Sequence, residues 1–105
     1  MNQDLTSNEI RILSTLETQQ MYGYEIIKEV KETSGYSMLL GSLYNTLKSM
    51  ERKGFVKSYW SDETSSGGRR KYFKITALGT RVLNDVKSKL LTQWGYPVLN
   101  PSSSR

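Results

Sequence analysis

The chain has 105 residues, a formal net charge of +5 and a pI near 9.5, with 36% hydrophobic and 24% charged residues. These values indicate one globular domain of ordinary composition that favours an acidic partner. Because the sequence contains no Cys and no His, disulfides, thiolate or imidazole metal sites and the commonest general base are excluded, so we expect neither an enzyme nor a bound cofactor.

Capping signals and apolar spacing predict two helices in the first third of the chain. Thr6 and Glu9 have the spacing of a capping box, and apolar residues recur at helical intervals behind them, so a first helix should reach about Thr18. Residues 19–23 should form a short polar turn. A second helix with a 3.6-residue apolar rhythm should then end just before Gly35.

A third helix and a hairpin follow. The helix should begin after a loop over residues 36–41 and stop at Gly54. Residues 55–60 and 70–75 are rich in aromatic and β-branched side chains, and the Ser/Gly-rich stretch 61–69 between them is typical of a turn. These segments predict a β-hairpin with a long polar tip.

The last predicted element is a long helix. Thr76 should cap it, Gly95 and Pro97 should end it, and its apolar positions outnumber what the small core needs. We therefore expect the helix over residues 77–95, followed by a disordered tail over residues 96–105.

The net charge is concentrated in residues 41–74. This stretch has eight basic and three acidic residues, whereas the other 71 residues balance at seven and seven. The basic residues are Lys48, Arg52, Lys53, Lys57, Arg69, Arg70, Lys71 and Lys74. Because they fall on the third helix and the hairpin, these two elements should form a cationic surface that suits a nucleic-acid duplex.

The order helix, helix, helix, strand, strand, helix predicts the fold class. It is α+β, mainly α: a winged helix-turn-helix domain over residues 1–76, with three helices and a two-stranded wing, plus the long C-terminal helix. In such domains the third helix enters the major groove and the wing lies beside the backbone or minor groove.

Several motifs occur in the order and spacing of one family, and they extend over about residues 8–92. They are MYGYEI at 21–26, GSLY at 41–44, MERKGFV at 50–56 and GGRRKYF at 67–73. The chain closely resembles the PadR-like transcriptional regulators. That resemblance implies a homodimeric repressor of the short type, which binds double-stranded DNA and pairs its last helix with the helix of its partner.

The surplus apolar face of the last helix supports a homodimer independently. The residues that should form the dimer interface are Leu83, Val86, Leu90 and Trp94. Two-fold pairing would present recognition helices to half-sites about 34 Å apart, so we expect a pseudo-palindromic operator.

Four residues of the third helix are candidate DNA contacts. Tyr44 and Lys48 should lie on its exposed side, and the resemblance implies that Tyr44 touches DNA, although it could instead pack under the helix. Asn45 departs from the proline common in the family, and it could read adenine or be a solvated residue. Ser42 could bind a phosphate or only cap the helix.

The other DNA candidates flank this helix. Tyr24 matches a family position that contacts the phosphate backbone, with core packing as the alternative, and Gly23 would let the turn approach the duplex. Arg69 and Arg70 should contact phosphates or a narrow minor groove, and Lys71 could be turned away by strand alternation. The alternative for all three is that they are solvated side chains at the flank of the hairpin and contact no DNA.

Four further hypotheses remain open. Trp94, and less readily Trp60, could bind a flat aromatic effector at the dimer centre, although a tryptophan there could be an interface anchor. The fold could serve as a protein-interaction module, which would leave the charge unexplained, or bind RNA. The regulator could also be an activator.

Without a signal peptide or a membrane-length apolar run, we expect a cytoplasmic protein.

Overall fold

The structure is a computed structural model and describes residues 5–61 and 68–93. It contains four helices and three strands in that part of the chain. In chain order they are α1 (Ser7–Leu16), β1 (Met21–Tyr22), α2 (Gly23–Ser34), α3 (Leu40–Arg52), β2 (Val56–Trp60), β3 (Lys71–Ile75) and α4 (Ala77–Gln93). The predicted winged helix-turn-helix architecture, mainly helical, is confirmed.

The helix ends follow from local chemistry. The backbone N–H of Glu9 donates to Thr6 Oγ1 at 3.1 Å and that of Thr6 donates to Glu9 Oε1 at 2.9 Å, which is the predicted capping box. Gly35 ends α2 with φ of 76°, and Gly54 follows α3 with φ of 85°, a conformation that glycine adopts without strain. Thr76 Oγ1 accepts from the N–H of Gly79 at 3.0 Å, so it caps α4.

The sheet has three antiparallel strands in the order β1-β3-β2. Its hairpin pairs Val56 with Ile75 and Trp60 with Lys71, and β1 adds Met21 opposite Phe73. The prediction that residues 19–23 form only a turn is therefore wrong, since Met21 and Tyr22 extend the sheet.

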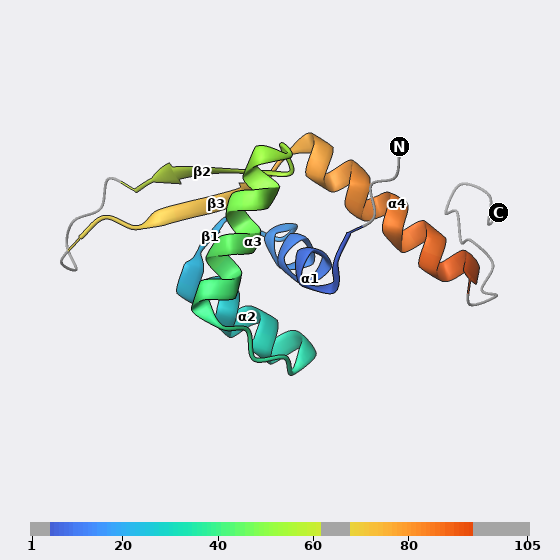
Figure 1. Cartoon of the computed structure of the whole chain (residues 1–105), viewed down its shortest axis with the longest axis horizontal. Coiled ribbons are helices and arrows are strands. Elements are labelled where there is room, and N and C mark those ends of the chain that lie inside the picture. The colour runs from blue at the N-terminus through green and yellow to red at the C-terminus, as the bar shows by residue number, and fades with distance from the viewer. Residues whose placement is uncertain (1–4, 62–67, 94–105) are drawn as a thin grey trace.

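One hydrophobic core joins all the elements. Ile12, Leu13 and Leu16 of α1 meet buried residues of α2, α3, the sheet and α4. An ion pair bridges the start of α1 and the end of α3, where Lys53 Nζ lies 3.0 Å from the buried carboxylate of Glu9. Figure 1 shows the wing extending to one side of the helices and α4 running away on the other.

Some expectations fall outside the described residues. These are the glycine Gly67 at the wing tip, Trp94, the helix end at Gly95 and Pro97, and the tail over residues 96–105.

Candidate nucleic-acid interface

Tyr44 lies where α3, α2 and the sheet meet. A Cβ atom on Gly23 would collide with the hydroxyl of Tyr44 and lie 2.9 Å from its Cζ, so the phenol lies directly on the start of α2. The Tyr44 ring centroid is 6.2 Å from that of Phe73, and 41% of the residue is exposed. Tyr44 therefore packs on one side and is open to solvent on the other. Gly23 is buried, so its missing side chain makes room for Tyr44.

The exposed side of α3 carries the other helix candidates. Ser42, Asn45 and Lys48 are exposed, whereas Leu43, Leu47 and Met50 are buried. The N-cap of α3 is Leu39, and no side chain caps the helix. Ser42 is thus the third residue of α3, and the alternative that it serves as the N-cap is wrong.

Tyr24, in the first turn of α2, is 68% exposed. Burial in the core, which was the alternative for this residue, is excluded at that exposure. The start of α2 and the start of α3 lie on the same side of the molecule as the wing (Figure 1).

Aromatic rings surround the cations at the base of the wing. The guanidinium carbon of Arg70 lies 4.6 Å from the ring centroid of Tyr22, and that of Arg69 lies 5.9 Å from the ring centroid of Trp60. Lys71 Nζ is 5.8 Å from the same Trp60 ring. Cation–π attraction of this kind restricts long side chains without neutralising them.

Five of the predicted DNA contacts line one hollow of about 560 Å³. Its lining residues are Tyr22, Tyr24, Tyr44, Trp60, Arg69, Arg70 and Lys71. An adjoining hollow brings Lys48 together with Tyr44 and Lys71. Ser42 and Asn45 lie outside both hollows, on the exposed side of α3.

Tyr22 and Trp60 are members of this surface that the sequence analysis did not select as DNA contacts. Trp60 could have been found from strand pairing, because an antiparallel hairpin places it opposite Lys71. Tyr22 had no such signal, since its segment was assigned to a turn.

The cations of the surface have few internal partners. Lys53 is paired with Glu9, and this carboxylate neutralises its positive charge. Lys48, Arg69, Arg70 and Lys71 form no ion pair with any carboxylate in the described ranges 5–61 and 68–93. Within those ranges no carboxylate neutralises these four cations, so their charge can attract an external anion.

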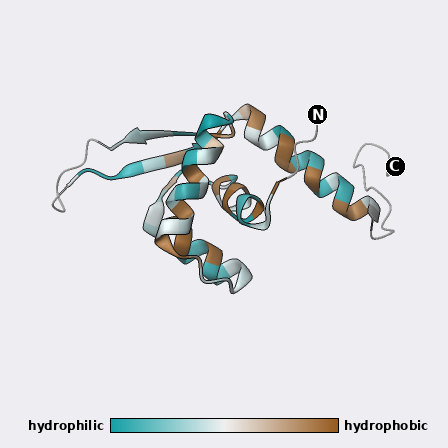
Figure 2. Cartoon of the chain, viewed as in Figure 1, coloured by the Kyte–Doolittle hydropathy of each residue, from teal (hydrophilic) through white to brown (hydrophobic). Residues whose placement is uncertain are grey.

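The predicted dimer residues divide between core and surface. Leu83 has no exposed surface and belongs to the core of the single chain, so the expectation that it faces a partner is wrong. Val86 is half-buried, and Leu90 is 40% exposed. Figure 2 shows apolar bands continuing along α4 to its end. The helix extends beyond the winged-helix body, so the far bands are not packed on that body.

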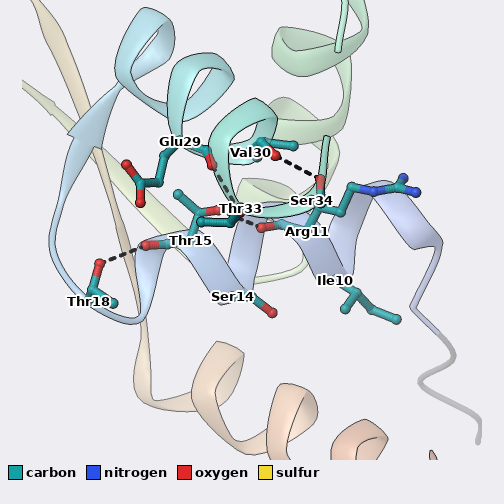
Figure 3. Close-up of a pocket in the computed structure, with 9 residues that line it drawn as sticks. All are labelled: Ile10, Arg11, Ser14, Thr15, Thr18, Glu29, Val30, Thr33 and Ser34. Atoms are coloured by element: carbon teal, nitrogen blue, oxygen red, sulfur yellow. Dashed lines mark hydrogen bonds between the residues drawn. The ribbon is translucent and has the colours of Figure 1, made fainter. Parts of the chain in front are cut away.

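A third hollow, of about 320 Å³, lies between α1 and α2 (Figure 3). Two of its hydroxyl groups are used within the helices: Thr15 donates to the carbonyl of Arg11 at 2.8 Å, and Ser34 donates to that of Val30 at 2.7 Å. The guanidinium of Arg11 lies 4.0 Å from the ring centroid of Tyr36. These polar groups are not arranged to converge on a ligand.

Within the part of the chain that the structure describes, no helix is long and apolar enough to cross a membrane, and no cluster of three potential metal ligands is found.

Residues 12–85 match the transcriptional regulator PadR-like family. "Uncharacterized protein X" of Lysinibacillus sphaericus is 34% identical over 85 residues, which cover 79% of this chain and 73% of that protein. A PadR family transcription regulator from Clostridium difficile R20291 is 42% identical, with a TM-score of 0.72 over 85% of this chain and 98% of the other.

Bacillus subtilis PadR, solved in complex with operator DNA, has the same fold. It is 24% identical, with a TM-score of 0.69 over 78% of this chain and 47% of the other. The regulators of this family are not enzymes. With the family match extending over more than half of its residues and a winged helix as its fold, the chain belongs to the PadR-like family of transcriptional regulators.

Proposed function

We propose that this regulator is a homodimeric repressor that binds a pseudo-palindromic DNA operator through α3 and the wing. The observation that carries the proposal is the single hollow in which Tyr24, Tyr44, Arg69, Arg70 and Lys71 come together. Three separate segments supply these residues. A convex duplex rimmed by phosphates is the ligand that such an open, cationic and aromatic surface fits best.

The contacts divide into two kinds. Tyr44 and Asn45, on the exposed side of α3, are assigned to base edges in the major groove. Tyr24, Ser42 and Lys48 are assigned to phosphates, which set the register of the helix but carry no sequence information. Arg69, Arg70 and Lys71 of the wing are assigned to the backbone or the narrow minor groove beside the major-groove contact.

Pairing of two chains through α4 completes the proposed complex. Val86 and Leu90 continue the apolar face of α4 beyond the core, and Trp94 would extend it. Two-fold symmetry then places two α3 helices about one helical turn, ~34 Å, apart. Bacillus subtilis PadR, which shares this fold, has been solved with operator DNA. Occupation of an operator that overlaps a promoter would repress by excluding polymerase.

Selection of bound duplexes from random DNA, followed by sequencing, tests this function. The expected result is an inverted repeat with half-sites about one helical turn apart. Affinity for the selected duplex should fall steeply as salt rises, because each neutralised phosphate releases counterions. No enrichment, or binding that ignores salt, would favour a protein-interaction module instead.

Two variants test the division of roles on the selected and on a random duplex. Asn45→Ala should weaken binding to the selected duplex by about tenfold and relax its sequence preference. Arg70→Ala should weaken binding to both duplexes alike and reduce the salt slope by roughly one unit. Equal losses on both duplexes from Asn45→Ala would show that Asn45 does not read bases.

A further inference from the structure

Leu39 is the most exposed large apolar side chain in the part of the chain that the structure describes. It is 75% exposed, and the next residue, Leu40, is 38% exposed. Both lie at the start of α3, where Leu39 is the N-cap and Leu40 is the first helical residue. A lone leucine on a protein surface is ordinary, but two together at the end of a recognition helix ask for an explanation.

Helix stability does not explain Leu39. The N-cap position favours Ser, Thr, Asp and Asn, whose side chains accept hydrogen bonds from the free N–H groups of the first turn. Thr6 does this for α1. Leu39 makes no such bond, so α3 begins without a side-chain cap. The leucine therefore contributes neither a cap to α3 nor burial to the core.

The surroundings of Leu39 belong to the proposed DNA surface. Gly41 follows with open space around its Cα, since a Cβ there would meet nothing within 4 Å, and Ser42 and Tyr44 come next. In a helix-turn-helix domain the first residues of the recognition helix lie against base edges in the major groove. Leu39 thus borders the part of the duplex that carries sequence information.

We propose that Leu39 reads the C5-methyl group of a thymine in the major groove. The methyl group is the apolar feature that the major groove presents, and it distinguishes a T·A pair from the other base pairs. Burial of one methyl group against the leucine changes affinity by about fourfold. This inference rests on the proposed function and adds to it one base identity at each half-site.

Replacement of thymine by deoxyuridine tests the inference, because it removes the methyl group and leaves base pairing intact. In the selected duplex, thymines are replaced one position at a time, symmetrically in both half-sites. The wild-type protein should lose about fourfold in affinity per half-site at one position and little at the others. Leu39→Ser should bind the thymine duplex as weakly as the wild type binds the deoxyuridine duplex, with no further loss on the latter.

Leu39→Ser suits this test because serine is a preferred N-cap, so the variant should unfold at the same temperature as the wild type or higher. Leu78→Ser is the matched control, since Leu78 is 41% exposed but lies in the first turn of α4. It should keep the wild-type response to deoxyuridine.

Two outcomes would overturn the inference. The wild type could bind thymine and deoxyuridine duplexes equally at every position, or Leu39→Ser could keep the full methyl response. Failure of the proposed function is distinct from both, because then no duplex is selected at all.

Discussion

Tyr44 connects the proposed base-reading surface of α3 to α2 and the wing. Its ring packs near Phe73 of β3, its hydroxyl lies on Gly23 of α2, and its other side is exposed in the proposed interface. A movement of any of these elements should therefore shift the Tyr44 ring at the proposed base-reading surface. If Tyr44 reads bases as proposed, changes outside α3 should alter specificity through it.

Gly23→Ala should separate binding from stability. The new methyl group would displace the Tyr44 ring, which is the mobile end of a side chain and can move at little cost. Alanine also favours a helix over glycine by roughly 0.5–1 kcal/mol. We expect an unfolding free energy within about 1 kcal/mol of wild type, and a loss of about tenfold in affinity for the selected duplex. Urea unfolding and fluorescence anisotropy measure the two quantities.

The Tyr44→Ala background is the control for this variant. If Gly23→Ala acts through the displaced ring, it should have little further effect on binding once the ring is absent. A full additional loss in that background would mean that Gly23 acts by another route.

Tyr22 should position Arg70 for phosphate contact. A cation–π contact at an exposed site contributes about 0.5–1 kcal/mol, so Tyr22→Leu should weaken binding to all duplexes by about two- to fivefold. Tyr22→Phe keeps the ring and should bind as the wild type does. Titration of a random duplex with the three proteins measures the difference. Equal losses for Leu and Phe would assign the effect to the hydroxyl instead.

At the scale of elements, hydrogen bonds and a buried glycine join the turn between α3 and β2 to the start of α4. Thr76 Oγ1 donates to the carbonyl of Gly54 at 2.6 Å, and the N–H of Thr76 donates to the carbonyl of Phe55 at 3.0 Å. Gly79, the third residue of α4, is buried. This junction determines the direction in which α4 leaves the winged helix.

Gly79→Ala should loosen that junction. A Cβ atom on Gly79 would collide with the carbonyl oxygen of Phe55 and lie 2.9 Å from Cγ1 of Ile75. Because backbone cannot yield as a side chain can, the strain should exceed the gain in helix propensity and destabilise the protein by about 1–3 kcal/mol. Gly41→Ala is the matched control, since nothing lies within 4 Å and it should be neutral or stabilising. Thermal unfolding of both variants measures the difference in stability. Equal unfolding temperatures would contradict the predicted strain at Gly79.

Local signals were sufficient to predict most elements. The capping box of Thr6 and Glu9, the glycines that follow α2 and α3, and the alternation of the hairpin are short-range features, and each element lies near its expected position. The strand β1 was missed because two residues are too short for alternation. It exists only by pairing with Phe73 and Tyr72, about fifty residues away.

The candidate site was predictable as residue types but not as contacts. The family resemblance selected Tyr24 and left core packing open, which the fold excludes, whereas the ring of Tyr22 over Arg70 depends on a non-local strand. The same limit explains Leu83. Periodicity placed it on the apolar face of α4, but only the packed fold reveals that this face is core at Leu83 and surface at Leu90.

The two proposed functions, DNA binding and pairing, fall on opposite ends of the molecule. The wing and the starts of α2 and α3 lie at one end, and α4 extends from the other (Figure 1). The wing cations Arg69, Arg70 and Lys71 lie at the first of these ends, whereas exposed leucines, Leu90 and Leu91, lie on the second. Such a division lets two chains pair at one end without covering the surface proposed to bind DNA.

Leu90→Lys should test the proposed pairing and its consequence for DNA binding together. A charge in the apolar face of α4 must be desolvated if that face is buried, so the variant should sediment as a monomer where the wild type sediments as a dimer. Ser88→Lys adds the same charge to an exposed position on another side of α4 and should remain a dimer.

DNA binding should change with the oligomeric state. The Leu90→Lys monomer has one α3 and one wing, so its salt slope should fall to about half that of the wild type. Its affinity for the full operator should drop by about a hundredfold, because the second half-site is lost. Sedimentation and salt-dependent anisotropy measure these effects. A dimeric Leu90→Lys protein with an unchanged salt slope would show that the chains pair elsewhere or not at all.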